Sequence, residues 1–390
     1  LIAARLDITL MLADYGDRIA GMLEFNTDLF NRVTIETFIT HFTRVLQSVT
    51  QDVALGIDTI ELASATELRQ LLRLDGRQND NAEAVLPLTP MQRDFSFDSL
   101  REPDTTRNSI GDALELPFPV DVTRWQRAVQ SVVDAHPFLR TRIVEATQPW
   151  MEPLYQVIER QQLAQCEVLD WRNRACGEAE LKAALEAQVL QTWDVLQKPL
   201  IRHYLIQVED ARWFSVVSAH HAIFDGVSSR NYFRSLLAAY QNQSVPGNTS
   251  ANLKIWAQQR SQQTDNAAVL DYWRNALAQS EPLGNRAAQP GQVVVDQWML
   301  QPDELLLLQR WCDARRVSIT NYLRSLYALA LQHCHYHDNR VVLIDAMAGR
   351  GGALDDAIGC FFQFVPFVQQ TGTGVHTFSD EQVEWFRAGS

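Results

Sequence analysis

The stretch HHAIFDG at residues 220–226 is the segment from which both the fold and the chemistry of this chain can be argued. It follows the apolar run WFSVVS at 213–218, which has the length and composition of a buried strand, and it precedes a helical pattern from Val227. A turn between a strand and a helix is held rigidly yet can face a cleft. An imidazole, with an ordinary pKa of about 6.5, can accept or position a proton there at neutral pH. The pattern therefore predicts the active-site turn of an acyl-transfer enzyme.

The residues of this turn cannot all play the same part. Adjacent side chains at a strand end point to opposite sides, so we expect His221 to face a cleft and His220 to be structural. Asp225 could orient an imidazole, but we favour a role in fixing the turn or accepting hydrogen bonds from the first amides of the next helix. Gly226 lacks a Cβ, so a substrate can approach its backbone N–H closely. We expect the serines at 228–229 to be first-turn helix residues, because no GxSxG motif surrounds them.

The length, net charge and cysteine content limit the classes of protein to which this chain can belong. The 390 residues suffice for two to three cores, and a net charge of −13 disfavours a nucleic-acid partner. Five cysteines without a CxxC pair fit a reducing compartment. No apolar run approaches the length of a membrane span, so we expect a cytoplasmic protein with no membrane partner. Because the first residue is Leu1 rather than Met, we expect a piece of a longer protein.

Two further segments suggest chemistry at first sight. The run HCHYHD at 333–338 does not place its three histidines on one helix face, and no HExxH accompanies it, so we expect no metal site. The run AGRGG at 348–352 lacks the lysine of a phosphate-binding loop. Its Arg350 could instead pair with a carboxylate such as Asp225.

Hydrophobic periodicity predicts a mixture of helices and strands. Helices are expected at 34–49, 122–135, 178–192, 227–240, 267–278, 303–315 and 320–333, and strands at 6–12, 19–25, 200–208, 213–218, 341–346 and 358–368. The elements do not alternate strictly, as they would in a doubly wound sheet. The expected class is therefore α/β in the broad sense, a mixed α+β arrangement.

Four segments taken together resemble the condensation domains of nonribosomal peptide synthetases. The stretch at 220–226 matches the HHxxxDG motif of that family. LTPMQ at 88–92 resembles its opening motif, HPFLRTRI at 136–143 its second, and IGCFFQFVPF at 358–367 its fifth. Four motifs in the family's order are far more specific than any one of them.

This resemblance implies a two-lobed, V-shaped fold of the chloramphenicol-acetyltransferase-like superfamily. It implies an acyltransferase that forms amide bonds: the amine of an acceptor aminoacyl thioester attacks a donor acyl or peptidyl thioester. Both substrates would arrive on the 4'-phosphopantetheine arms of donor and acceptor peptidyl carrier proteins, with neighbouring synthetase domains as further partners. No cofactor would be bound by the chain itself.

The resemblance also assigns roles to individual residues. His221 would position or deprotonate the attacking amine, with His220 beside it, and the Gly226 N–H would polarise the donor carbonyl. Asp225 would be structural. Arg350 would be its partner, because a Gly-Arg pair before the fifth motif is a family feature, and Arg140 would brace the same region.

Residues 1–70 resemble a different part of the same family, the closing segment of a condensation domain. DITL at 7–10, LEFNTDLF at 23–30 and TIE at 34–36 match the run that normally ends such a domain. The segment that resembles the end of a condensation domain therefore comes before the segment that resembles the body of one.

The expected domain plan therefore has four parts. Residues 1–70 are the closing segment, 71–85 a polar linker, 86–250 the N-terminal lobe, and 251–390 a truncated C-terminal lobe. One hypothesis is that the closing segment docks on the C-terminal lobe of the same chain or a neighbour, covering a bare sheet edge. The alternative is that the sequence is cut from a synthetase in which one condensation domain directly precedes another.

Departures from the family pattern leave a second function open. Ala135 and Pro137 in the second motif, and Gln363 and Phe364 in the fifth, differ from the usual residues. The alternative is a catalytically degenerate module that docks carrier proteins or a tailoring enzyme. Val227 is common in epimerisation domains, but the acidic segment that such domains need is lacking, so that interpretation ranks third.

Overall fold

A computed structural model describes most of the chain and divides it into two units. The described residues are 6–53, 60, 67–69, 72, 80–146, 152–174, 177–197, 199–245, 256, 267–278, 299–335 and 340–370. The first unit comprises residues 1–264 with 356–360, and the second comprises 265–355 with 361–390. Helices and strands are mixed in both units, which confirms the expected class.

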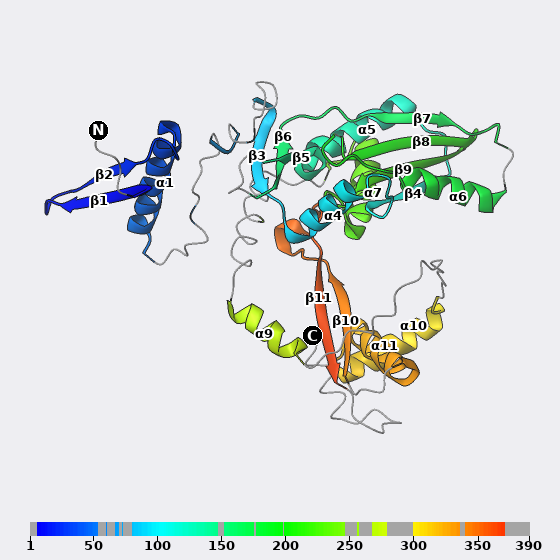
Figure 1. The fold of residues 1–390 in the computed structure, drawn as a ribbon. Coiled ribbons are helices and arrows are strands. Elements are labelled where there is room, and N and C mark those ends of the chain that lie inside the picture. Colours follow the sequence, from blue (N-terminus) through cyan, green and yellow to red (C-terminus); the bar gives the residue numbers. More distant parts are fainter. Residues whose placement is uncertain are drawn as a thin grey trace. The chain divides into compact units, whose positions relative to one another are not determined.

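A four-stranded sheet forms the centre of the first unit (Figure 1). Its strands are β4 (Ser109–Leu116), β9 (Arg212–His220), β8 (Ile201–Glu209) and β7 (Cys166–Asp170), side by side in that order. β9 is antiparallel to both β4 and β8, and β7 runs parallel to β8. β9 is therefore an inner strand, paired on both edges.

Three helices cover this sheet. They are α5 (Val122–Ala135), α6 (Glu178–Val189) and α7 (Gly226–Tyr240). Buried side chains of α5 and α7 share one apolar cluster with the sheet, and those of α6 share a separate cluster with it. The sheet is thus buried on both faces.

Strand β9 shows how the sequence produces this arrangement. Val217 and Ala219 belong to the cluster with α5 and α7, while Phe214 and Val216 belong to the cluster with α6. Successive side chains of a strand point to opposite faces, so a strand covered on both sides reads as a continuous apolar run. That is why 213–218 lacks polar alternation.

The first unit also contains a second sheet and a further helix. The sheet has the order β3 (Ala82–Pro87), β6 (Leu154–Glu159) and β5 (Thr141–Glu145), all antiparallel. A single 3-10 turn, Pro137–Arg140, leads into β5. Helix α4 (Pro90–Arg101) follows β3. None of these elements was expected from periodicity.

Strand β3 also corrects one boundary. The polar linker predicted at 71–85 cannot extend that far, because β3 begins at Ala82 and pairs with β6. The residues at 73–79 lie outside the described part of the chain. The other domain boundaries and the docking of residues 1–70 stay predictions.

Near the N-terminus a hairpin and a helix form as expected. β1 (Ile8–Asp14) and β2 (Ile19–Phe25) are antiparallel, and α1 spans Arg32–Gln51. The helix starts earlier than predicted, because the side chain of Asn31 accepts a hydrogen bond from the backbone N–H of Thr34 at 2.8 Å. Asparagine is a strong N-cap residue.

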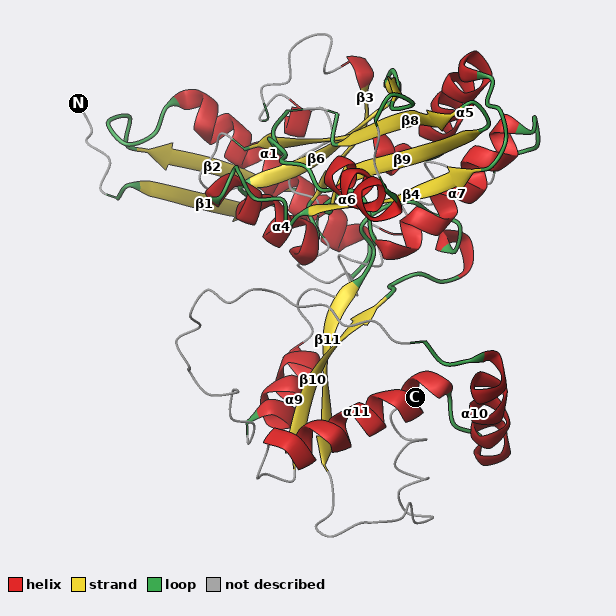
Figure 2. Ribbon diagram, turned by 90° about the vertical axis from the view of Figure 1, so that its right-hand side faces the viewer, coloured by secondary structure: helices red, strands yellow, loops and turns green. Residues whose placement is uncertain are grey.

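The second unit combines helices with a strand pair. Its elements are α9 (Ala267–Leu277), α10 (Pro302–Arg315), α11 (Ile319–His335), β10 (Arg340–Met347), a 3-10 turn at Gly352–Leu354, and β11 (Gln363–Gln370). β10 and β11 run antiparallel, side by side (Figure 2). The strand predicted at 358–368 starts later than expected, and Pro366 lies inside it opposite Ile344. Among the described residues this sheet has two strands, so each has an edge that no other strand pairs with, where proline is tolerated.

One polar pair lies inside the first unit's core. His203 on β8 is fully buried, and its Nδ1 lies 2.7 Å from the hydroxyl of Tyr232 on α7. Burial lowers the pKa of His203 from 6.5 to about 3 and raises the pKa of Tyr232. Both side chains are therefore neutral at pH 7.

The His203 pKa predicts how stability depends on pH. Between pH 6.5 and about 3 the unfolded chain binds a proton at this histidine and the folded chain does not. The free energy of unfolding should therefore fall as the pH decreases, by about 1.4 kcal/mol per pH unit from this residue. In urea titrations between about pH 6 and 5, the variant His203→Asn should show a slope smaller by that amount. Equal slopes for parent and variant would contradict the assignment.

Candidate active site

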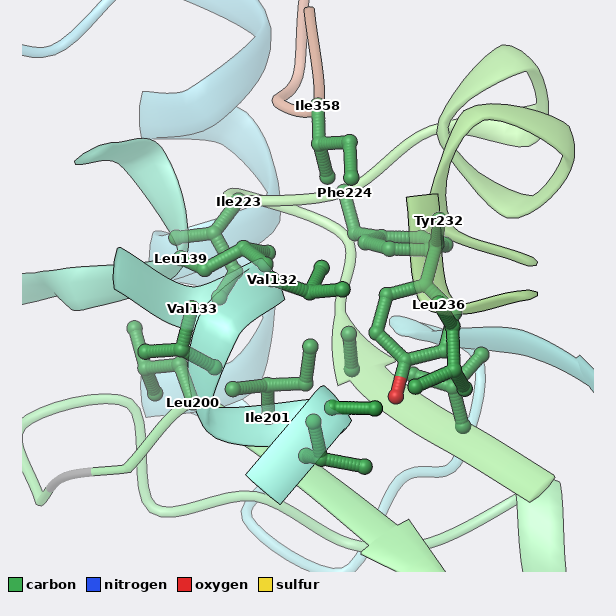
Figure 3. Close-up of a cluster of buried hydrophobic side chains, with 14 of the residues drawn as sticks. Val132, Val133, Leu139, Leu200, Ile201, Ile223, Phe224, Tyr232, Leu236 and Ile358 are labelled. Carbon is green, nitrogen blue, oxygen red and sulfur yellow. The ribbon is translucent and has the colours of Figure 1, made fainter. Parts of the chain in front are cut away.

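The candidate turn is anchored at both ends and in its middle. β9 ends at His220, and α7 begins at Gly226. Between them Ile223 and Phe224 are buried, and Figure 3 shows their side chains among the apolar cluster, with Ile358 beside Phe224. The backbone N–H of His221 donates to the carbonyl of Asn108 at 2.8 Å. The turn is therefore held by both packing and the main chain.

His220 has no ring nitrogen to offer a substrate. Its side chain is fully buried. The Ala222 N–H donates to Nδ1 at 3.1 Å, so we assign the proton to Nε2, which lies 2.9 Å from the Ser99 Oγ. Burial, and then the charge of the neighbouring His221, lowers the pKa of His220 to about 3. Both ring nitrogens of His220 are therefore engaged by the protein itself.

His221 is placed differently. It is only partly buried, and its ring stacks on that of Phe95, with centroids 4.3 Å apart and planes 8° from parallel. Burial lowers the pKa of His221, while backbone hydrogen bonds of His221 and Phe224 and the charge of Asp225 partly raise it. The balance favours the neutral imidazole, which can accept a proton.

Asp225 caps the helix that follows the turn. Its Oδ1 accepts hydrogen bonds from the backbone N–H of Ser228 at 3.0 Å and from the Ser228 hydroxyl at 2.9 Å. The same hydroxyl accepts a hydrogen bond from the Gly359 N–H at 3.0 Å. Ser228 thus joins the cap to the segment 356–360 of the same unit. The sequence predicts only a first-turn residue there, and no local pattern signals the second contact.

Gly226 lies in open space. It is exposed, and among the described residues no atom beyond its chain neighbours and its own helix backbone would lie within 4 Å of a Cβ added to it. Its φ is not in the left-handed region, so nothing in the protein's own packing requires a glycine here. If glycine is required at this position, the reason would be a bound molecule that comes close to the Gly226 backbone.

Helix α4 supplies contacts that sequence reasoning missed. Thr89 and Gln92 form a capping box: the Thr89 Oγ1 accepts from the Gln92 N–H at 3.3 Å, and the Gln92 Oε1 accepts from the Thr89 N–H at 3.0 Å. The Gln92 Nε2 also donates to the carbonyl of Ala222 at 2.9 Å. Thr-Pro-x-Gln is a recognisable helix start, with proline at the first helical position. That signal could have predicted the helix, but not its contact with the turn.

The contacts of Arg140 are with the framework of the first unit. Arg140 is buried, and its guanidinium donates to the carbonyls of Val133, Asp134 and Glu159 and to the Glu83 carboxylate. In the described part of the chain it therefore braces α5 against the three-stranded sheet, rather than the turn itself.

Arg350 belongs to the second unit. Its guanidinium lies over the Phe361 ring, 4.6 Å from the centroid, and 3.4 Å from the carbonyl of Ala348. The expected pairing with Asp225 would join the two units and stays a prediction.

Metal and membrane signals can be addressed only for the described residues. Among these, no group of three or more His, Cys, Asp or Glu side chains is placed to hold a metal ion. The side chains of the run at 333–338 lie outside that part. The described helices include none that is both long and apolar enough to span a bilayer.

Comparison with known proteins identifies similar sequences. A family model described as "Condensation domain" matches residues 82–384. The chain is 32% identical over 198 residues to the nonribosomal peptide synthetase dtxS1 of Metarhizium robertsii, covering 50% of this chain and 2% of that protein. It is 28% identical over 232 residues to the HC-toxin synthetase of Cochliobolus carbonum, covering 59% and 4%. The chain thus spans only a small part of these relatives' length.

Solved structures share the fold. The first condensation domain of the calcium-dependent antibiotic synthetase, in complex with a substrate analogue, aligns with a TM-score of 0.63 at 17% identity, covering 79% of this chain and 75% of that one. A four-domain nonribosomal peptide synthetase bound to AMP and glycine aligns at 0.65 and 15% identity, covering 79% and 24%. The expected fold is confirmed.

The Asp225 cap predicts a specific loss of stability. Asp225→Ala should lower the free energy of unfolding by about 2 kcal/mol. The buried N–H and hydroxyl of Ser228 both lose the side-chain oxygen of Asp225 and keep only the carbonyls of residue 225 and Gly359, each at 3.0 Å. Asp121→Ala is the matched control: Asp121 caps α5 through the Arg124 N–H at 3.0 Å but is exposed, so about 1 kcal/mol is expected. Urea denaturation measures both, and equal losses would count against the buried network.

Proposed function

We propose, from the premise that this chain belongs to the condensation domain family, that it forms an amide bond between two thioester-bound substrates. The acceptor would be an aminoacyl thioester and the donor an acyl or peptidyl thioester. The single observation that carries the proposal is a neutral, partly buried His221 held on a rigid turn. A neutral imidazole suits a reaction in which an amine must lose a proton.

In the proposed reaction the amine nitrogen attacks the thioester carbonyl carbon. A carbon–nitrogen bond forms, the carbon–sulfur bond breaks, and the thiol leaves. His221 would accept the proton that the amine loses, or hold the amine in line with the carbonyl. Since a thioester is already activated, orientation can supply much of the acceleration. Nδ1 of His221 is buried, so Nε2 is the nitrogen we assign to this contact.

Gly226 would stabilise charge on the donor carbonyl oxygen. It is the first residue of α7, where backbone N–H groups have no partner within the helix and the helix dipole favours negative charge. The open space around its α-carbon supports close approach by a substrate. Asp225 and Ser228 would hold this end of the helix in place without contacting the substrate.

The partners follow from this chemistry. We propose that donor and acceptor substrates arrive on the 4'-phosphopantetheine arms of two peptidyl carrier proteins, within a synthetase that contains further domains. The relatives that support this are synthetases many times longer than the matched segment of this chain, and one solved neighbour has four domains. No cofactor would need to be bound by the chain itself.

Removal of the His221 imidazole tests the proposal directly. With donor and acceptor carrier proteins loaded with a panel of amino acids, the parent should form a dipeptidyl product that mass spectrometry detects. His221→Ala should be slower by about 100-fold to 10,000-fold, whereas the control Asp121→Ala should keep its rate. A parent that binds both carriers but forms no product would favour a docking module over an enzyme.

Gly226→Ala separates stability from activity. An added methyl meets no protein atom, so the free energy of unfolding should stay within about 1 kcal/mol of the parent, and could rise because the unfolded chain loses freedom. Product formation should fall about tenfold or more, because the methyl obstructs the carbonyl's approach to the N–H. Gly177→Ala at the start of α6 has equally open surroundings and should leave the rate unchanged. Equal rates for parent and Gly226→Ala would remove Gly226 from the mechanism.

A further inference from the structure

One face of helix α4 contacts the first three residues of the candidate turn. Gln92, Phe95 and Ser99 follow the i, i+3, i+7 spacing of a single helix face. Each contacts a different residue of the turn at 220–226: Gln92 bonds its main chain, Phe95 stacks on an imidazole, and Ser99 bonds His220. Helix α4 therefore helps to fix the conformation of the turn.

The stack with Phe95 restricts the torsion that sets the plane of the His221 ring. The main chain of His221 is fixed by its hydrogen bond to the Asn108 carbonyl. That bond does not set the plane of the ring, because the second side-chain torsion of histidine is broad. The hydrogen bonds of the backbone at His221 and Phe224 act on the ring itself, and they add to the stack described next. A nearly parallel aromatic ring at 4.3 Å does restrict the plane, since any large rotation would break the face-to-face contact.

We propose that Phe95 is a positioning residue that sets the plane of the His221 imidazole. By holding the ring flat against α4, it directs the ring edge, and with it Nε2, towards the substrate. Its effect on catalysis rests on the proposed function, whereas the orientation itself does not. Phe95 acts through His221 and makes no contact with the reacting atoms.

Phe95 also affects the charge of the ring it covers. An apolar ring on one face excludes water, and burial is the main cause of the lowered pKa of His221. Among the described residues, the titratable groups that interact with it are Asp225, which opposes that shift, and His220, which is itself neutral because the pKa of that ring lies at about 3. Loss of Phe95 should therefore move the His221 pKa upward.

A leucine at position 95 keeps apolar bulk but removes the flat face. In Phe95→Leu, kcat should fall about threefold to tenfold while KM changes little, because the substrate does not contact this side chain. Phe95→Tyr should restore kcat. Phe97→Leu on the same helix is the matched control, since Phe97 is exposed, and it should leave kcat unchanged. Urea midpoints identify any variant that has lost its fold.

A second readout needs no activity. In the full chain labelled at histidine Cε1, the His221 Hε1 signal, identified by its loss in His221→Gln, should be shifted upfield by the Phe95 ring current. Phe95→Leu should abolish that shift and raise the His221 pKa measured by titration. Phe95→Tyr and Phe97→Leu should preserve both values.

These two readouts separate the inference from the proposed function. An unmoved signal in Phe95→Leu would overturn the inference whatever the activity. A moved signal with unchanged kcat would also overturn it, because the plane of the ring would then not matter. If the parent itself is inactive, the proposed function fails, and the inference is decided by the NMR shift and the pKa alone.

Discussion

Burial of strand β9 on both faces is the constraint on which the rest of the first unit depends. The strand is paired along both edges and packed between two apolar clusters, so its last residue cannot shift without disturbing both. The chain beyond it is anchored again by Ile223 and Phe224 in the core. A short turn between two such anchors presents its side chains in one geometry, which an orienting catalyst requires.

Within that turn the residues divide by burial. His220 is committed to hydrogen bonds with the Ala222 N–H and Ser99, and Asp225 to those from Ser228. Buried polar groups without such partners would cost stability, so these contacts stabilise the turn. His221 and Gly226 are the turn residues that remain accessible, one partly buried and one exposed. The degree of burial separates these two residues from the rest of the turn, and the motif HHxxxDG does not itself give the burial of each residue.

Prediction from periodicity worked best where one apolar face is long and regular. The helix expected at 122–135 has those bounds, and the strand expected at 200–208 is nearly β8. It failed for α4, whose buried residues Gln92, Ser96 and Ser99 are polar and therefore leave no hydrophobic pattern. A helix that contacts a polar site buries polar side chains, so hydrophobic periodicity is least informative next to the chemistry.

The sequence by itself determined the family, the mixed class of fold and the location of the candidate turn, because these are carried by local motifs and regular apolar spacing. The alternation of side chains along a strand also predicted that His221, and not His220, is the more accessible histidine. The tertiary structure alone decided that Phe95 lies flat on the His221 ring and that Ser99 contacts His220. It also placed Arg140 in the framework and joined Ser228 to Gly359. These contacts link residues far apart in the chain, and pairings of that kind depend on packing rather than on any local preference.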